Sequence, residues 1–296
     1  MRPRALVNVI AFVALLLSTF TIGASASPPP PPVPLAQVEP QLLEAFAQDA
    51  TAGYLIYFSE SPDLSAAYTL DWQARGRYVV QALRETAEKS QVGIRAYLDA
   101  QGAEYRSFWI DNVIAVESSS SKTVQALLSM PGVEQLRARR SPAVYLPEKS
   151  LSPQTVVPAA VESNLTHIGA DQAWALGYEG QGIVVAGIDT GVRYTHNALR
   201  AQYRGSLGDR YEHDYNWWDP YGDYPAYPAD DHGHGTHTMG TMVGDDGSAN
   251  QVGVAPGARW IACRACNTSD CTDDALLECA QFVVAPWDLA GTTPDP

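Results

Sequence analysis

The stretch from Asp231 to Gly240, Asp-His-Gly-His-Gly-Thr-His-Thr-Met-Gly, constrains the fold more than any other part of the chain. Histidines and glycines alternate in it, and small and apolar residues follow as far as Gly244. The pattern predicts a loop that runs into a tightly packed helix, with a histidine at the junction. Glycine inside a helix costs about 1 kcal/mol relative to alanine, so Gly235 and Gly240 predict close backbone packing or a special conformation.

Three interpretations of the histidines compete at this stage. His232, His234 and His237 could form a metal site, because imidazole is a common zinc ligand, and the chain would then be a metal-dependent hydrolase. They could also belong to a histidine-rich surface loop. In the third interpretation one histidine is a general base, which needs a carboxylate to fix its tautomer and stabilise its charged form.

The chain offers such a carboxylate upstream, at the end of a predicted strand. Residues 182–188, Gly-Ile-Val-Val-Ala-Gly-Ile, form a short apolar run, which is typical of a strand buried on both faces of a parallel sheet. Asp189 follows directly, at the carboxyl end where α/β folds place their sites. Asp-Thr-Gly also occurs in aspartic proteases, but those use two copies and this chain has one.

Three segments in this order resemble the motifs of the subtilases, the subtilisin-like serine proteases: 185–192, 234–240 and 253–258. Subtilisin has its aspartate first, its histidine second and its serine last. The resemblance implies a serine endopeptidase with a three-layer α/β domain and a mostly parallel sheet, acting on protein or peptide substrates without a required cofactor. It implies that Asp189 orients the general base His234. It also implies that His237 is structural, a buried and hydrogen-bonded histidine.

The family's nucleophile is not found in this sequence. The resemblance implies a serine in a Gly-Thr-Ser setting and an asparagine for the oxyanion hole. The serines after Gly240 are Ser248 and Ser269, the asparagines are Asn250 and Asn267, and none has that setting. We therefore expect a precursor truncated before the catalytic serine, with an incomplete domain that is inactive as written.

The N-terminus predicts export. Basic residues, an apolar run and Ala24-Ser25-Ala26 are typical of a signal peptide over 1–26, so we expect a secreted protein without a stable membrane anchor. Five consecutive prolines begin at Pro28, and we expect residues 27–49 to be an extended spacer.

A separate α+β domain is expected over residues 50–147. Its segments follow the ferredoxin-like order strand, helix, strand, strand, helix, strand: 54–58, 71–102, 105–110, 113–116, 122–130 and 133–138. A small module here resembles the subtilase propeptide, which would be the chain's own intramolecular inhibitor and chaperone. An accessory domain, or a chain that acts only as a propeptide-type protease inhibitor, remains an alternative. We expect a linker over 148–164 and the N-terminal part of the catalytic domain over 165–296.

The negative charge of the chain bears on which partners and ions it can bind. The net charge of −14 and pI of about 4.7 argue against nucleic acid and anionic membranes as partners. Many subtilases bind calcium through oxygen ligands. The acidic residues between 211 and 231 lack a calcium-loop spacing, so we interpret them as solvated loop charges and assign no ligands: Asp214, Asp219, Asp223, Asp230 and Asp231.

The four cysteines lie close together, which allows a zinc or a disulfide interpretation. Export favours disulfides. Residues 260–264 are expected to form a strand and 273–285 a helix. A cysteine at a strand end and one on the packed face of the next helix can approach closely, so we pair Cys263 with Cys279, and Cys266 with Cys271.

Overall fold

The computed structural model describes residues 37–143, 161–248 and 251–292. The predicted signal peptide, the run of prolines and most of the predicted linker lie outside these ranges. All of the described residues belong to one compact unit. Among the described residues, none of the helices has the length and apolarity needed to cross a bilayer.

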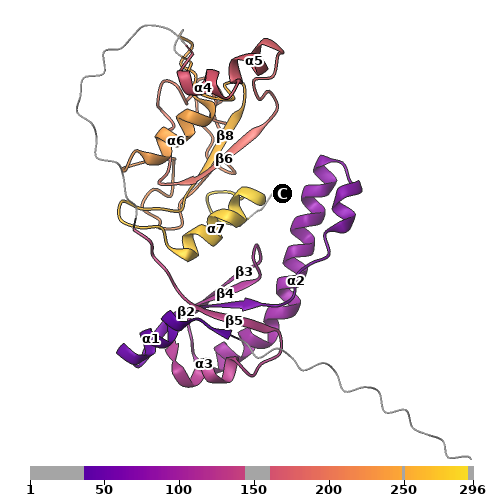
Figure 1. Ribbon diagram of the computed structural model, residues 1–296, viewed down its shortest axis with the longest axis vertical. Coiled ribbons are helices and arrows are strands. Elements are labelled where there is room, and N and C mark those ends of the chain that lie inside the picture. The colour runs from indigo at the N-terminus through magenta and orange to yellow at the C-terminus, as the bar shows by residue number, and fades with distance from the viewer. Residues whose placement is uncertain (1–36, 144–160, 249–250, 293–296) are drawn as a thin grey trace, which may run out of the picture. The chain divides into compact units, whose positions relative to one another are not determined.

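The first part of the described chain is a small α+β domain with a single sheet (Figure 1). Its strands lie in the order β1-β5-β2-β4-β3, and β2, β3, β4 and β5 pair antiparallel, as in the predicted ferredoxin-like fold. The short β1 adds a parallel edge to β5. The strands are β1 (Gln37–Val38), β2 (Thr51–Phe58), β3 (Tyr105–Phe108), β4 (Val113–Ser120) and β5 (Val133–Ala138).

Helices cover one face of this sheet. Side chains of α1 (Pro40–Gln48), α2 (Trp72–Gln101) and α3 (Ser121–Leu127) share one apolar core with β2, β4 and β5. A short 3-10 turn, η1 (Ser65–Thr69), precedes α2. The opposite face presents a second cluster that includes Leu55 and Phe108.

The long helix α2 begins and ends where its sequence predicts. The Asp71 side chain accepts the N–H of Ala74 at 2.8 Å, and Gly102 ends the helix with φ 66°. Gln91 interrupts the apolar stripe, yet it is buried. Its amide donates to the Phe108 carbonyl and to Asn112 Oδ1, which satisfies a polar group inside the core.

The prediction that residues 27–49 form only an extended spacer is wrong for its second half. Residues 37–38 pair as β1, and α1 begins at Pro40, where a proline fits the first helical turn. Leu42 is fully buried in the core, with Phe46 packed beside it. The apolar spacing of this short helix decides its structure, because it gives the chain a face to bury.

The second part of the described chain has three layers around a parallel sheet. Strand β8 (Arg259–Arg264) lies between β6 (Val184–Asp189) and β7 (Trp217–Trp218), parallel to both. Helix α6 (His234–Val243) packs on one face and α7 (Asp273–Val284) on the other. The predicted fold class, with a parallel three-layer α/β domain after an α+β module, is confirmed. The helices α4 (Ser163–His167) and α5 (Ala170–Ala175) precede the sheet, and α4 begins just inside the linker that had been expected to end at residue 164.

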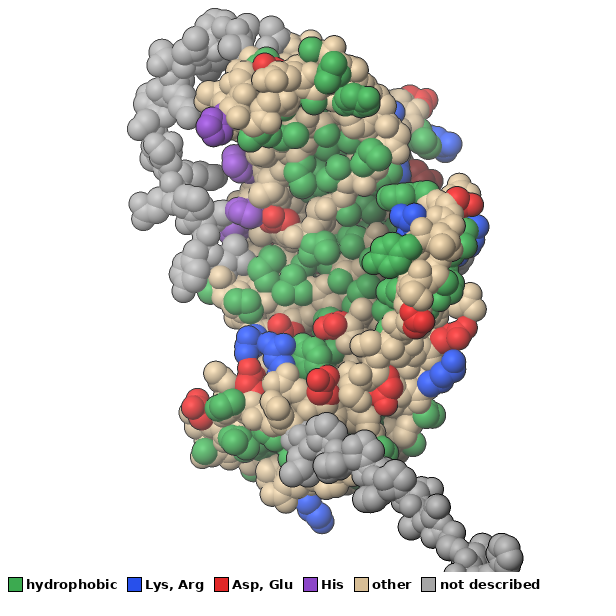
Figure 2. Space-filling model, turned by 45° about the vertical axis from the view of Figure 1, so that its right-hand side comes forward, with side chains coloured by type: hydrophobic (Ala, Val, Ile, Leu, Met, Phe, Trp, Pro, Cys, Tyr) green, Lys and Arg blue, Asp and Glu red, His purple; other side chains and the backbone are tan. Residues whose placement is uncertain are grey.

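Strand β6 is not buried on both faces, as its apolar sequence had predicted. Val184 and Ile188 are partly exposed, and Gly187 on the opposite face is buried. The reason is that β6 pairs only with β8 among the described strands, while α7 packs over β8. Hydrophobic side chains are widely exposed on the face shown in Figure 2, next to surface histidines.

Two disulfides lie at the end of β8, in the pairing expected from the sequence. Cys263 is joined to Cys279 of α7, with Cα atoms 5.4 Å apart, and Cys266 is joined to Cys271, with Cα atoms 4.1 Å apart. Helix α7 starts as predicted, with the Thr272 hydroxyl accepting the N–H of Ala275 at 3.2 Å. The first disulfide therefore fixes a helix to the sheet, and the second closes a short loop.

The two disulfides should contribute unequally to stability. They close loops with sequence separations of 16 and 5 residues. Loop-closure entropy then predicts a loss of about 3 kcal/mol for the Cys263→Ala/Cys279→Ala double variant and about 2 kcal/mol for Cys266→Ala/Cys271→Ala. Urea unfolding followed by tryptophan fluorescence measures both. Peptide mapping under non-reducing conditions checks the pairing, and a larger loss from the shorter loop would contradict the entropic account.

Candidate active site

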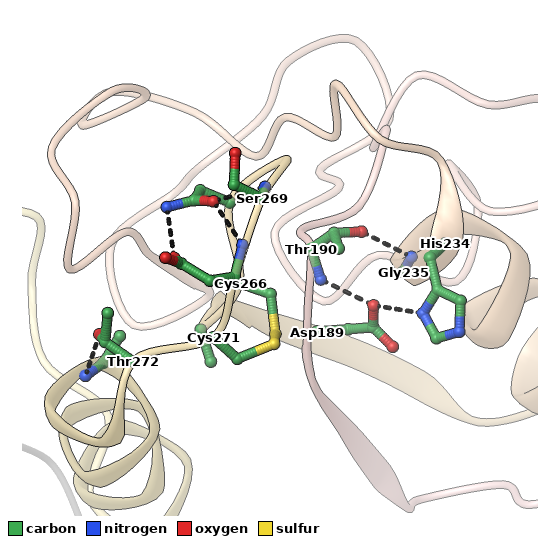
Figure 3. Close-up of a disulfide and its surroundings, with 12 residues drawn as sticks. Asp189, Thr190, His234, Gly235, Cys266, Ser269, Cys271 and Thr272 are labelled. Carbon is green, nitrogen blue, oxygen red and sulfur yellow. Dashed lines mark hydrogen bonds and ion pairs between the residues drawn. A yellow bond between two sulfur atoms is a disulfide. The ribbon is translucent and has the colours of Figure 1, made fainter. Parts of the chain in front are cut away.

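Asp189 and His234 meet where β6 ends and α6 begins (Figure 3). The distance from Asp189 Oδ1 to His234 Nδ1 is 2.7 Å, within the range of a charge-assisted hydrogen bond. The Asp189 side chain is largely buried, and the His234 side chain is 42% exposed. Among the described residues, none bonds the other ring nitrogen, Nε2, so it can face a reacting group.

Glycines allow the two elements to approach this closely. A Cβ atom on Gly235 would collide with the carbonyl oxygen of Gly191, and one on Gly191 would collide with the Ala229 carbonyl. Gly191 also has φ +103°, which other residues rarely adopt. The predicted close packing is therefore confirmed for Gly235. It is wrong for Gly240, where nothing lies within 4 Å of an added Cβ atom.

Three further hydrogen bonds hold Asp189. The Thr190 N–H donates to Oδ1 at 2.7 Å, and the Thr238 hydroxyl donates to Oδ2 at 3.1 Å. The N–H of Cys266 donates to the Asp189 carbonyl at 3.1 Å, which ties the chain after β8 to the end of β6. These donors fix the carboxylate that faces His234. The roles of Thr190 and Thr238 in holding Asp189 were not predicted from the sequence.

The three motif histidines do not form a metal site in the described part of the chain, where no group of three potential ligands is close enough to hold an ion. His237 is exposed, so the expectation of a buried, hydrogen-bonded residue is wrong. The buried face of α6 runs through Gly235, Met239 and Val243 at intervals of four residues, and position 237 lies off that stripe. His232 is half-buried and lies near His234, with ring centroids 6.4 Å apart.

The acidic stretch before the motif is not simply solvated, as had been expected. Asp219 is buried and accepts the N–H groups of Tyr221 and Tyr224. It also faces Arg264, a buried side chain at the end of β8 whose role was not predicted from the sequence. Although burial opposes its charge, Arg264 has a raised pKa because Asp223, Asp219 and Asp231 surround the guanidinium. Asp214 Oδ1 accepts the N–H of Leu289. These acids organise the loop internally.

The α+β domain contacts α7 through ion pairs. Arg106 of β3 binds Asp274 and, at 2.9 Å, Glu278, while Arg139 lies 3.0 Å from the other oxygen of Asp274. Burial raises the pKa of Glu278, and the hydrogen bond from Trp218 and the charge of Arg106 oppose that rise. Leu277 packs against the second apolar cluster of the sheet. The uncovered face of the first sheet therefore meets the acidic start of α7.

Residues 140–143 run along the segment 270–273, next to the shorter disulfide. The N–H of Asp273 donates to the Arg140 carbonyl at 3.2 Å, and the N–H of Arg140 donates to Asp273 Oδ2 at 2.8 Å. The N–H of Cys271 donates to the Pro142 carbonyl at 3.0 Å. Ala143 forms an antiparallel bridge with Asp270. Residues 140–143 thus bind along this segment as a short extended peptide would, and the segment adjoins the loop whose Cys266 contacts Asp189.

No serine of the expected kind is found beside His234 in the described residues. Ser269 lies on the loop closed by Cys266 and Cys271, and its side chain points away from His234 (Figure 3). Its N–H donates to Asn267 Oδ1 at 2.7 Å, in a local turn. The site as described therefore contains a carboxylate and an imidazole in hydrogen-bond contact, without a nucleophile.

Comparisons with known proteins agree with the motifs. A family model described as "Subtilase family" matches residues 180–284. Bacillopeptidase F of Bacillus subtilis is 39% identical over 250 residues, which cover 79% of this chain and 17% of that protein. Minor extracellular protease Vpr of the same organism is 42% identical over 125 residues, 41% of this chain and 14% of that protein. The chain thus spans less than a fifth of either relative.

Among solved structures, fervidolysin from Fervidobacterium pennivorans, a keratinolytic enzyme related to subtilisin, aligns with a TM-score of 0.45 and 17% identity. The alignment covers 76% of this chain and 33% of that chain.

Two glycine variants should separate close approach from helix propensity. Gly235→Ala places a methyl group against the Gly191 carbonyl, and we expect a loss of about 1–3 kcal/mol or failure to fold. The matched control, Gly240→Ala, adds the same group to the same helix in open space, and we expect a gain of up to about 1 kcal/mol. Urea unfolding measures both. Equal effects at the two positions would contradict the packing argument.

Proposed function

We propose that this chain, whose residues 180–284 match the subtilase family, is part of a secreted serine endopeptidase in which His234 is the general base. The observation that supports this most directly is the 2.7 Å contact between Asp189 Oδ1 and His234 Nδ1, built on motifs in the family order. A hydrogen bond from Nδ1 keeps the proton on that nitrogen and leaves Nε2 as the basic atom.

In the proposed reaction, His234 Nε2 takes the proton of a serine hydroxyl as the serine oxygen attacks the peptide carbonyl. The imidazolium then returns the proton to the leaving amine, and Asp189 stabilises the positive charge in between. Backbone or side-chain N–H groups stabilise the oxyanion of the tetrahedral intermediate. Asp189 does not take the proton; its role is to hold the ring and its tautomer.

The nucleophile is the part that this sequence does not supply, since neither Ser248 nor Ser269 has the family setting. Without a serine the site lacks the group that forms the acyl intermediate. The 296-residue chain is therefore expected to show no peptide hydrolysis on its own.

The α+β domain is proposed to be the intramolecular inhibitor of the domain that follows. Support comes from residues 140–143, which occupy the backbone edge at 270–273 as an extended peptide would. The ion pairs of Arg106 and Arg139 with Asp274 add a second contact. A peptide substrate could not pair with the same edge while residues 140–143 lie on it.

Export is proposed from the N-terminal sequence, with residues 1–26 as the signal peptide. A secreted protein would also keep its two disulfides oxidised. One relative is named as an extracellular protease, which agrees with this proposal.

A chimaera tests the catalytic assignment. Residues 1–284 of this chain would be fused to the remaining catalytic segment of Bacillopeptidase F, including its serine. We expect hydrolysis of a protein substrate that falls about 10⁴-fold or more with Asp189→Asn or His234→Ala. His237→Ala is the matched control, because this exposed histidine lies one helical turn away, and it should leave kcat/KM nearly unchanged.

Other outcomes would favour the alternatives. Activity that survives His234→Ala would refute the general base. Zinc in the purified protein, lost together in His232→Ala and His237→Ala, would favour a metal-dependent hydrolase. An inactive chimaera that still inhibits a second subtilase would favour a protein that acts only as an inhibitor.

The inhibitor proposal has its own test at α7. Proteolysis between Leu146 and Leu165 would leave two pieces held together by this contact. We expect Arg106→Ala to weaken their affinity about tenfold, since the half-exposed arginine is one of two partners of the buried Asp274. Gel filtration and calorimetry measure the affinity. Arg95→Ala, which removes an arginine paired with Glu88, is the control and should have no effect.

A further inference from the structure

The carboxylate of Asp230 accepts five hydrogen bonds from described residues. Its Oδ1 accepts from the Thr190 hydroxyl at 2.9 Å, the N–H of His232 at 3.2 Å and the N–H of Gly233 at 2.7 Å. Its Oδ2 accepts from the N–H of Thr236 at 2.8 Å and from the Thr236 hydroxyl at 2.5 Å. Both carboxylate oxygens are therefore committed to the loop and first turn around His234.

These contacts fix the start of α6. The first N–H groups of a helix lack partners within the helix, and they attract negative charge. Asp230 takes the N–H of Thr236, and the Thr190 hydroxyl takes the N–H of Gly235 at 2.9 Å. His234 lies between the loop residue Gly233 and the helical residue Gly235, and the donors on both sides of it are bound.

Thr190 joins this network to Asp189. It is 1% exposed, its hydroxyl links Asp230 to Gly235, and its own N–H donates to Asp189 Oδ1. That same oxygen accepts from His234 Nδ1. The strand end that holds the carboxylate and the helix start that holds the imidazole are thus connected through one buried hydroxyl and one carboxylate.

We propose that Asp230 is a positioning residue that sets the Asp189–His234 hydrogen bond, acting through Thr190 and the backbone of residues 232–236. It does not touch a reacting atom. Its relevance to catalysis rests on the proposed function above, in which His234 is the base. A displacement of the imidazole by about 1 Å costs catalysis heavily, so such a residue controls rate without taking part in bond changes.

The test uses the intact 296-residue chain and needs no activity. Proton NMR observes the His234 Nδ1–H resonance, which is visible only while a hydrogen bond protects it from exchange with water, and His234→Ala assigns it. We expect Asp230→Ala to lose this resonance while the protein stays folded by circular dichroism. Asp230→Asn keeps one accepting oxygen and should retain a weakened resonance.

Three further variants make the result specific. Asp231→Asn changes the neighbouring carboxylate, which faces Arg264 at 3.4 Å, and should keep the resonance unchanged. Thr190→Val removes the linking hydroxyl at nearly constant volume and should lose the resonance, whereas Thr190→Ser should restore it. If Asp230→Ala does not fold, this threonine pair decides the question.

Retention of the resonance in Asp230→Ala or Thr190→Val, with only a lower Tm, would overturn the proposal and leave Asp230 a purely structural residue. Absence of the resonance from the unsubstituted protein would overturn it as well. The expected NMR pattern together with an inactive chimaera would instead refute the proposed function while the positioning role stands.

Discussion

The approach of two backbones, at Gly191 and Gly235, is the contact on which the rest of the site depends. With no side chain on either residue, the carbonyl of the strand end lies against the first turn of α6. Asp189 and His234 are thereby brought within 2.7 Å although they come from different elements. A carboxylate and an imidazole hold a short hydrogen bond only if their supports are this rigid, because each side chain otherwise explores several rotamers.

The sequence predicts well where local chemistry decides the structure. The length of α2 follows from Asp71 and Gly102, which cap it, and from apolar residues at helical spacing. The order of strands and helices in the first domain follows from the same kind of pattern. The glycines of the motif predicted the close packing at Gly235. The pair Asp189 and His234 was also identified from the sequence, through motifs, and the structure brings the two together; their catalytic role stays a prediction.

The remaining features depend on partners that are distant along the chain. Asp219 of the loop and Arg264 of β8 form a buried ion pair. The sequence around either residue alone therefore does not predict that its charge is buried. Asp230 resembles its neighbour Asp231 in sequence, yet only Asp230 lies where a helix start and a threonine hydroxyl converge. The exposure of His237 depends on which stripe of α6 meets the sheet. For Asp230, the clue in the sequence was its position four residues before His234, just ahead of a predicted helix.

Both sides of the contact between α7 and the α+β domain belong to one polypeptide. Their meeting is therefore intramolecular, with an effective concentration on the order of millimolar for a short connection. Breaking the chain between 143 and 161 would leave every ion pair at Asp274 and Glu278 in place but would make the association bimolecular. After such a break, dilution would favour separation of the two parts. The contact that is fully formed within one chain would then depend on the protein concentration, and so on the volume into which the protein is released.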